Sequence, residues 1–201
     1  MYKFEIEQLA LQDACLIRHP VFADDRGRFS VTSHQAEFAA RSLQTEWVQE
    51  NESFSRDAFT VRGLHAQHPP FEQAKLVRCV AGSILDIIVD ARQDSPSFGH
   101  SVAVELSPSQ PRMLFVPRGF LHGFITLEPD CIVNYKVDGE YSPEHDFSVA
   151  WNDSELALDW PSEAENVILS EKDRNAQGWR DFVRKNQFRM AHTTTGREMS
   201  V

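Results

Sequence analysis

The chain has 201 residues, and 30 acidic against 20 basic side chains give it a formal net charge of −10 at pH 7. This length suits one domain with a core of ordinary size. The acidic balance argues against a general nucleic-acid binder and against attachment to an anionic membrane, because both need clustered basic surface. A hydrophobic fraction of 41%, with 14 Phe and 4 Trp, excludes a chain that is disordered throughout.

The three cysteines, Cys15, Cys79 and Cys131, are an odd number at wide spacings. They form neither a disulfide framework nor a zinc-binding pattern, so reduced thiols are the simplest interpretation. The first residues contain no long apolar run of the kind found in secretory signals, and no window approaches 18 consecutive apolar residues. We therefore expect a cytoplasmic protein.

The elements expected along the chain are mostly short strands. After the first strands, residues 34–43 form a short amphipathic helix candidate, and residues 170–185 form a second one near the C-terminus. Between them, strand patterns separated by turn residues recur at intervals of roughly 8–15 residues. They cover Lys75–Ala81, Ser83–Asp90, Ser101–Leu106, Met113–Pro117, Gly123–Leu127 and Cys131–Val137. This spacing predicts an antiparallel sandwich or barrel.

The chain shows no internal repeat and no linker that divides it. We expect one domain over residues 1–185. Residues 186–201 are expected to form a loose C-terminal tail, since the stretch from Met190 to Val201 is polar and without pattern.

Residues whose side chains could act in catalysis or ligand binding concentrate in three segments: Val61–Lys75, Pro117–Phe124 and Asn134–Pro143. With their neighbours they resemble the dTDP-4-dehydrorhamnose 3,5-epimerase family of nucleotide-sugar enzymes. The matching sequence motifs occur in the same order as in the family: Asp25–Gly27, Val48–Asn51, Arg62–His65, Lys75–Arg78, Ser95–Gly99, Pro117–Phe124, Tyr135–Lys136, Trp151–Asp153 and Trp160–Pro161. The resemblance implies an all-β, cupin-type jelly roll with a few short, mainly C-terminal helices. It also implies a homodimer that uses no metal and no organic cofactor.

The resemblance implies that the chain epimerises C3, C5 or both in a nucleoside-diphosphate 4-keto-6-deoxy sugar. The ketone acidifies the neighbouring C–H bonds, so the reaction needs a base, an acid on the opposite face and a positive group near the enolate. By resemblance His65 is the base, since an imidazole pKa near 6.5 suits proton abstraction. Asp173 orients that imidazole, Tyr135 is the acid, and Lys75 stabilises the enolate.

Further positions match family residues that contact the substrate. Arg62 matches a diphosphate contact, for which a guanidinium fork is well suited. The implied substrate-binding set is Arg26, Phe29, Gln49, Asn51, Arg62, His122 and Asp86.

Several of these residues also have an ordinary structural interpretation. Ser170 and Asp173 fit the pattern of a helix N-cap, a role that is compatible with catalytic pairing. Tyr135 lies in an apolar strand pattern, where tyrosine is usually a core residue. Arg62 and His65 would face opposite sides of a regular strand, so a shared pocket requires a bulge or twist, for which Gly63 is the expected place.

The chain departs from the family pattern on the nucleotide side. Val31 occupies a position where the family has Glu, and Glu140 precedes Tyr141 where the family commonly has two aromatic residues. A lost stacking ring costs on the order of 1 kcal/mol. These positions leave open which nucleotide the pocket takes, and the family includes members that invert a single centre.

Two other functions are considered. In a metal-dependent cupin, Pro117–His122 would be the second metal motif and Gly63–Gln67 the first, but Gln67 stands where a metal-binding His is expected. Alternatively, the chain is a non-catalytic nucleotide-sugar binder that has kept the pocket.

Overall fold

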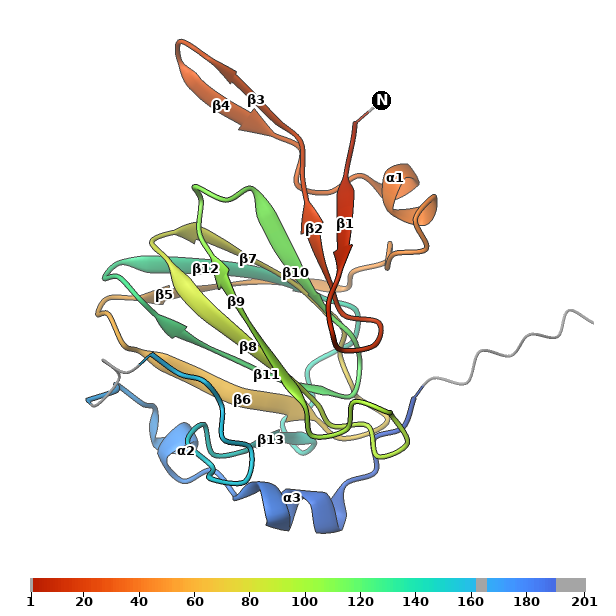
Figure 1. Ribbon diagram of the computed structural model, residues 1–201, viewed down its shortest axis with the longest axis vertical. Coiled ribbons are helices and arrows are strands. Elements are labelled where there is room, and N and C mark those ends of the chain that lie inside the picture. The colour runs from red at the N-terminus through yellow and green to blue at the C-terminus, as the bar shows by residue number, and fades with distance from the viewer. Residues whose placement is uncertain (1, 162–165, 191–201) are drawn as a thin grey trace, which may run out of the picture.

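Two antiparallel sheets face each other in the computed structural model, which describes residues 2–161 and 166–190 (Figure 1). The six-stranded sheet has the order β1 (Glu5–Gln8), β2 (Cys15–Arg18), β10 (Arg112–Val116), β7 (Lys75–Ala81), β12 (Cys131–Val137) and β5 (Gln49–Ser55). The five-stranded sheet has the order β13 (Asp146–Ser148), β6 (Val61–Gln67), β11 (Phe120–Thr126), β8 (Ile84–Asp90) and β9 (Ser101–Leu106). The expected all-β jelly roll is confirmed, and each of the six strands predicted from residue 75 onward is present.

The strands form because apolar side chains alternate toward the space between the sheets. In β12, Cys131, Val133 and Val137 are buried, while the residues between them are partly exposed. Opposite them, Ile84 and Ile88 of β8 are fully buried. Each such side chain contributes about 1.5–3 kcal/mol when it is removed from water. The two inner faces thus form one core, and polar residues in this space mark the site described below.

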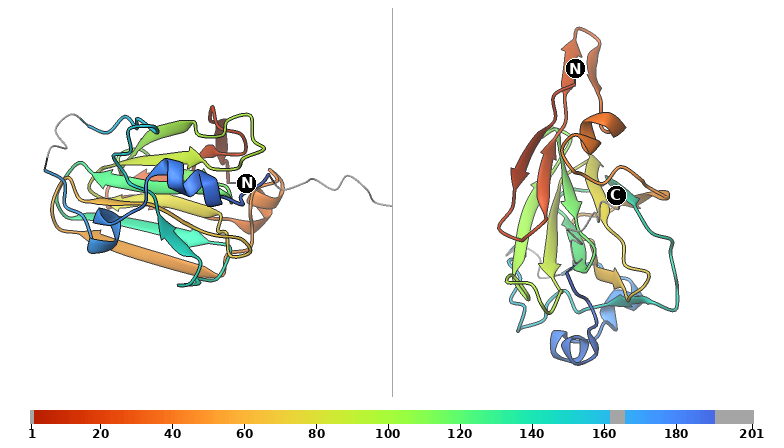
Figure 2. Two further views of the ribbon diagram at one scale, coloured as in Figure 1. Left: turned by 90° about the horizontal axis from the view of Figure 1, so that it is seen from below. Right: turned by 90° about the vertical axis from the view of Figure 1, so that its right-hand side faces the viewer.

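A third, two-stranded sheet made of β3 (Val21–Asp24) and β4 (Gly27–Ser30) is a hairpin that projects from the body of the molecule (Figures 1 and 2). Every residue from Val21 to Phe29 is exposed. Near its turn, Nη1 of Arg28 donates a hydrogen bond to the Pro108 carbonyl at 2.5 Å. The hairpin is therefore an arm and not part of the sandwich.

The helices are short. α1 (Gln35–Ala39) lies within the predicted range 34–43 and packs Phe38 against the outer face of the six-stranded sheet. The expectation of one helix over residues 170–185 is wrong, because the range contains α2 (Glu171–Arg174) and α3 (Trp179–Lys185). Between them the chain turns, and the carboxylate of Asp153 accepts a hydrogen bond from Trp179 N at 2.8 Å.

Beyond α3 the chain remains packed up to Met190. Phe188 is fully buried and lies in an apolar cluster with Phe147 and Phe182. Residues 191–201, the remainder of the expected loose tail, lie outside the described residues. Within the described residues, no helix is long and apolar enough to cross a membrane.

Candidate active site

His65 and Asp173 form a close pair between β6 and α2. His65 Nε2 lies 2.5 Å from Asp173 Oδ1. Asp173 is buried, and its other oxygen accepts a hydrogen bond from Ser170 Oγ at 2.9 Å. Burial alone would raise the pKa of the Asp173 carboxyl, but the hydrogen bonds from His65 and Ser170 outweigh it and lower the pKa. Asp173 is therefore a carboxylate at neutral pH, and it fixes the orientation of the His65 ring.

The capping interpretation of Ser170 is also correct. Ser170 is the N-cap of α2, and its Oγ accepts a hydrogen bond from Asp173 N at 3.1 Å. The same turn of helix that needs a cap thus presents Asp173 to His65.

A bulge at Gly63 brings Arg62 and His65 to the same face of β6. His122 pairs with His65 and Phe124 pairs with Arg62, so three steps along β6 match two along β11. Gly63 has φ +112°, and a Cβ there would lie 2.6 Å from the His122 carbonyl oxygen. Only glycine fits this close approach. The irregularity expected from the strand period is confirmed.

A second pair of His and Asp lies behind the first. His122 Nε2 is 3.0 Å from each oxygen of Asp86, and it is hydrogen-bonded to Oδ2, while Oδ1 has no hydrogen-bond partner among the described residues. Asp86 is fully buried. Burial lowers the pKa of His122 despite the nearby carboxylate, and the Lys75 ammonium lowers it further. His122 is thus held as a neutral side chain in the wall of the cavity at neutral pH.

Lys75 and Tyr135 reach the same space from the six-stranded sheet. Burial lowers the pKa of Lys75 to about 8, against the opposing effects of Asp86 and Asp146, so the ammonium still predominates at neutral pH. Burial raises the pKa of Tyr135 more than the positive charge of Arg62 lowers it, so the phenol keeps its proton. Arg62 is anchored to β5 by hydrogen bonds from Nε to Ser55 Oγ at 3.1 Å and from Nη2 to the Phe54 carbonyl at 2.9 Å.

Two adjoining cavities share His65, Lys75 and Tyr135 as a common wall. The first, of about 360 Å³, also contains Gln49 and Asn51 of β5, and the second, of about 450 Å³, contains Arg62, His122 and Asp173. Together they are large enough for an elongated ligand. All predicted site residues except Arg26 and Phe29 are therefore at this site, with Asp86 placed behind His122.

Comparisons with known proteins agree with this geometry. The family model described as dTDP-4-dehydrorhamnose 3,5-epimerase matches residues 8–181. The enzyme of that name from Methanothermobacter thermautotrophicus is 42% identical over 87% of this chain and 94% of its own length. The chain belongs to the dTDP-4-dehydrorhamnose 3,5-epimerase family. It is accordingly an isomerase of the epimerase type.

Solved structures of this family superpose closely on the chain. The dTDP-6-deoxy-D-glucose-3,5-epimerase from Legionella pneumophila, solved with dTDP-4-keto-L-rhamnose, has a TM-score of 0.88 and 33% identity and covers 94% of this chain and all of its own. A 3'-monoepimerase from Streptomyces bikiniensis, solved with dTDP-quinovose, has a TM-score of 0.83 and 28% identity, with 89% and 90% coverage. The family fold thus serves enzymes that invert one centre or two.

The metal-cupin motifs of this epimerase do not form a metal-ligand set. The amide of Gln67 is fully used, because Nε2 donates to the carbonyls of Phe71 and Glu140 and Oε1 accepts from Ser142 N. His65 and His122 are each bonded to a carboxylate. Among the described residues, no group of three or more His, Cys, Asp or Glu side chains is placed to hold a metal ion. Gln67 instead stabilises the loop between β12 and β13 through its hydrogen bonds to Glu140 and Ser142.

Sequence reasoning missed part of the first cavity of this epimerase. Asp146 accepts hydrogen bonds from Tyr141 Oη at 2.9 Å and from Lys172 Nζ at 2.5 Å, and all three side chains are at the cavity. A signal for Lys172 was its position next to Asp173 in the same turn. Of the two departures from the family pattern, Glu140 is exposed beside Tyr141, and Val31 packs against the outer-face core near Phe38.

Proposed function

We propose that this epimerase inverts both C3 and C5 of a dTDP-linked 4-keto-6-deoxy sugar, with His65 as base and Tyr135 as acid. The observation that carries the proposal is their placement on facing sheets, β6 and β12, across one cavity. A base and an acid on opposite walls reach the two faces of a sugar ring between them, which is the requirement for inversion.

The proposed step begins with proton abstraction. Because Nε2 of His65 is bonded to Asp173, Nδ1 is the nitrogen that accepts the proton from the carbon next to the ketone. The C–H electrons move into the ring to form an enolate, whose oxygen is stabilised by the ammonium of Lys75. Tyr135 then donates its phenolic proton to the opposite face of the carbon, where the electron pair of the enolate forms the new C–H bond. Solvent takes the abstracted proton from His65 and returns a proton to the Tyr135 phenolate, so both groups are restored. The same groups act at the second carbon after the ring has moved.

The nucleotide is proposed to extend along β5. Gln49 Nε2 donates a hydrogen bond to Asn51 Oδ1 at 2.6 Å, and both residues line the first cavity. Arg62 is suited to the diphosphate, because β5 already holds two sides of its guanidinium in place. The ligands named for the Legionella and Streptomyces relatives are dTDP sugars, which supports thymidine over other bases.

The experiment that tests this function is a product analysis with 4-keto-6-deoxyglucose carried on dTDP, CDP, GDP or UDP. In D₂O the wild-type chain is expected to convert the dTDP compound to a product inverted at C3 and C5, with deuterium at both carbons. Inversion at one carbon only would contradict the two-centre assignment. Preferential turnover of another nucleotide would contradict the assignment of thymidine.

We further propose that the active form is a homodimer in which the β3–β4 hairpin of one copy completes the cavity of the other. Arg26 and Phe29 match ligand-contacting positions of the family, yet neither is in the lining of the two cavities. They belong to the β3–β4 hairpin, which projects from the body of the molecule (Figure 2). Phe22 and Phe29 are 52% and 64% exposed on that arm. Exposed aromatic residues at this density are typical of a contact surface.

Mixed dimers test the exchange of hairpins. Arg26→Ala and His65→Ala are each expected to give an inactive homodimer. Dimers formed by co-expression of the two variants contain one cavity with both wild-type residues, so random pairing restores roughly one quarter of wild-type activity. If each hairpin served its own cavity, no activity would be gained by mixing.

A further inference from the structure

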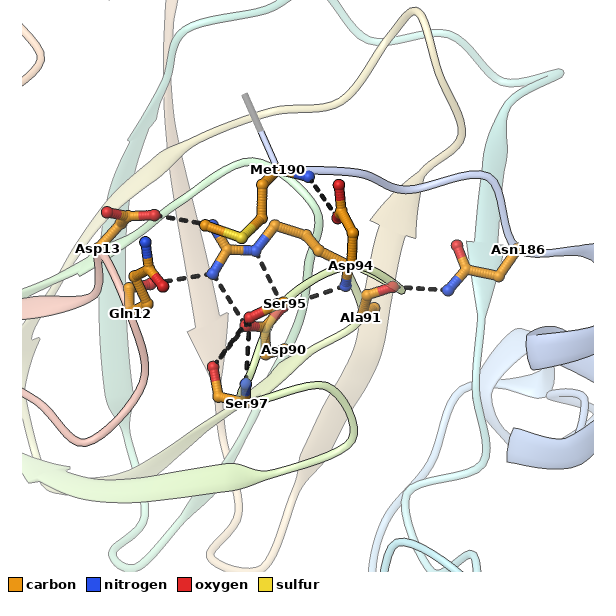
Figure 3. A network of polar contacts seen from close by, with 10 residues as sticks. Gln12, Asp13, Asp90, Ala91, Asp94, Ser95, Ser97, Asn186 and Met190 are labelled. Atoms are coloured by element: carbon orange, nitrogen blue, oxygen red, sulfur yellow. Dashed lines mark hydrogen bonds and ion pairs between the residues drawn. The ribbon is translucent and has the colours of Figure 1, made fainter. Parts of the chain in front are cut away.

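The segment from Asn186 to Met190 lies beyond residue 181, where the match to the family model ends, yet it is built into the cavity wall. Three hydrogen bonds attach it to the loop after β8, and those made by Asn186 and Met190 are drawn in Figure 3. Asn186 Nδ2 donates to the Ala91 carbonyl at 2.5 Å, Gln93 N donates to the Phe188 carbonyl at 3.1 Å, and Met190 N donates to Asp94 Oδ1 at 2.8 Å. The segment is thus fixed along one side of that loop.

The loop is itself held by a buried ionic network centred on Asp90 and Arg92, which are 0% and 3% exposed (Figure 3). Asp90 accepts hydrogen bonds from Arg92 Nε and Nη2 and from the hydroxyls of Ser95 and Ser97. Arg92 also reaches Asp13 Oδ2 at 2.8 Å. A fully satisfied buried network of this kind makes its surroundings rigid.

The network and the C-terminal segment meet at the cavity. The guanidinium of Arg92 lies 4.7 Å from the centre of the Phe120 ring. A Cβ on Gly119 would be 2.6 Å from Arg92 Cγ and 3.7 Å from Phe188 Cβ, so the Gly119 backbone is enclosed between these two side chains. Gly119, Phe120 and Phe188 belong to the wall of the cavity that contains His65, Lys75 and Tyr135.

We propose that Phe188 is a positioning residue that sets the shape of this cavity for the nucleotide sugar. Its ring is fully buried and packs against His68, Phe147 and Phe182, so it acts from behind the turn at Gly119 and Phe120. The segment 186–190 is then a specificity element that lies outside the part that the family model matches. The proposal rests on the proposed function, because it assumes that the nucleotide sugar occupies this cavity.

Phe182 provides a matched control. It is as fully buried as Phe188 and lies in the same apolar cluster, but it belongs to α3 and is not part of the cavity wall. Replacing either phenylalanine by leucine removes a similar amount of buried packing. A purely structural role of Phe188 therefore predicts the same change in stability and in substrate binding for both variants.

The test compares Phe188→Leu with Phe182→Leu in the full chain. Both variants are expected to lower Tm by similar amounts. Phe188→Leu is expected to raise KM for the dTDP sugar and Kd for dTDP roughly tenfold, with kcat within about twofold of wild type. Phe182→Leu is expected to leave all three constants unchanged. Equal constants in the two variants, or a fall in kcat alone for Phe188→Leu, would overturn the proposal.

Titration calorimetry with dTDP separates this proposal from the proposed function. If wild type binds dTDP but turns over no dTDP sugar, the proposed function fails. A tenfold weaker binding of dTDP by Phe188→Leu would then still support the role of Phe188 in shaping the cavity. If wild type does not bind dTDP, the assumption that the cavity holds this nucleotide is wrong, and the proposal falls with it. Leucine is chosen because it keeps the site apolar and the chain folded.

Discussion

Replacing His65 by alanine is expected to abolish deuterium exchange at both C3 and C5. The loss of rate is expected to be about 10²–10⁴-fold, the typical contribution of a positioned general base. Both centres are affected because the proposed mechanism assigns proton abstraction at each carbon to the same imidazole, that of His65, which lies in the wall shared by the two cavities and contacts Asp173 at 2.5 Å. The measurement is nuclear magnetic resonance of the dTDP sugar during incubation in D₂O.

His100 offers the control for this experiment. It is exposed at the turn before β9, so His100→Ala removes an imidazole from the same sheet without touching the cavity. Exchange in this variant should equal that of wild type. Should His65→Ala still exchange either carbon at the wild-type rate, His65 would not be the base for that carbon.

Replacing Tyr135 by phenylalanine is expected to separate exchange from inversion. The phenol is the donor on the face opposite His65, and burial holds its pKa above the ordinary value, so at neutral pH it carries the proton that inversion needs. Without it, His65 still removes a proton, exchanges it with solvent and returns it to the same face. Net epimerisation should fall about 10²–10⁴-fold, while deuterium uptake with retained configuration continues.

Chiral analysis of the recovered sugar, together with its deuterium content, measures both quantities in one sample. The informative value is the ratio of exchange to inversion, which should rise in Tyr135→Phe and stay undefined in His65→Ala. A variant that loses exchange as completely as His65→Ala would show that Tyr135 is needed for abstraction itself, contrary to the division of roles proposed above.

Much of the fold was predictable because its signals are local. β9 and β12 show the alternation of a strand with one inward-facing side, while β8 is an almost continuous apolar run, which is typical of a fully buried strand. The prediction of a single helix over 170–185 was wrong because the spacing of apolar residues does not reveal the break of four residues between α2 and α3. Ser170 and Asp153 each satisfy the backbone at the start of a separate helix.

The proposed catalytic set has a different origin. His65, Lys75, Tyr135 and Asp173 were assigned through motifs that resemble a family, and no spacing along the chain would have joined residues 65 and 173. The bulge at Gly63 was the exception, since the period of a strand alone showed that Arg62 and His65 needed it.

Residue types and their local order were enough to establish an acidic, all-β domain and the chemistry available to it. The three-dimensional arrangement was needed to show that Arg26 and Phe29 are not in the lining of the two cavities and that Phe188 belongs to the wall of the first. Both depend on contacts between segments far apart in sequence, as where Asn186 bonds to Ala91. Such contacts are selected by packing and by the need to pair buried polar groups, and neither leaves a periodic signal in the chain.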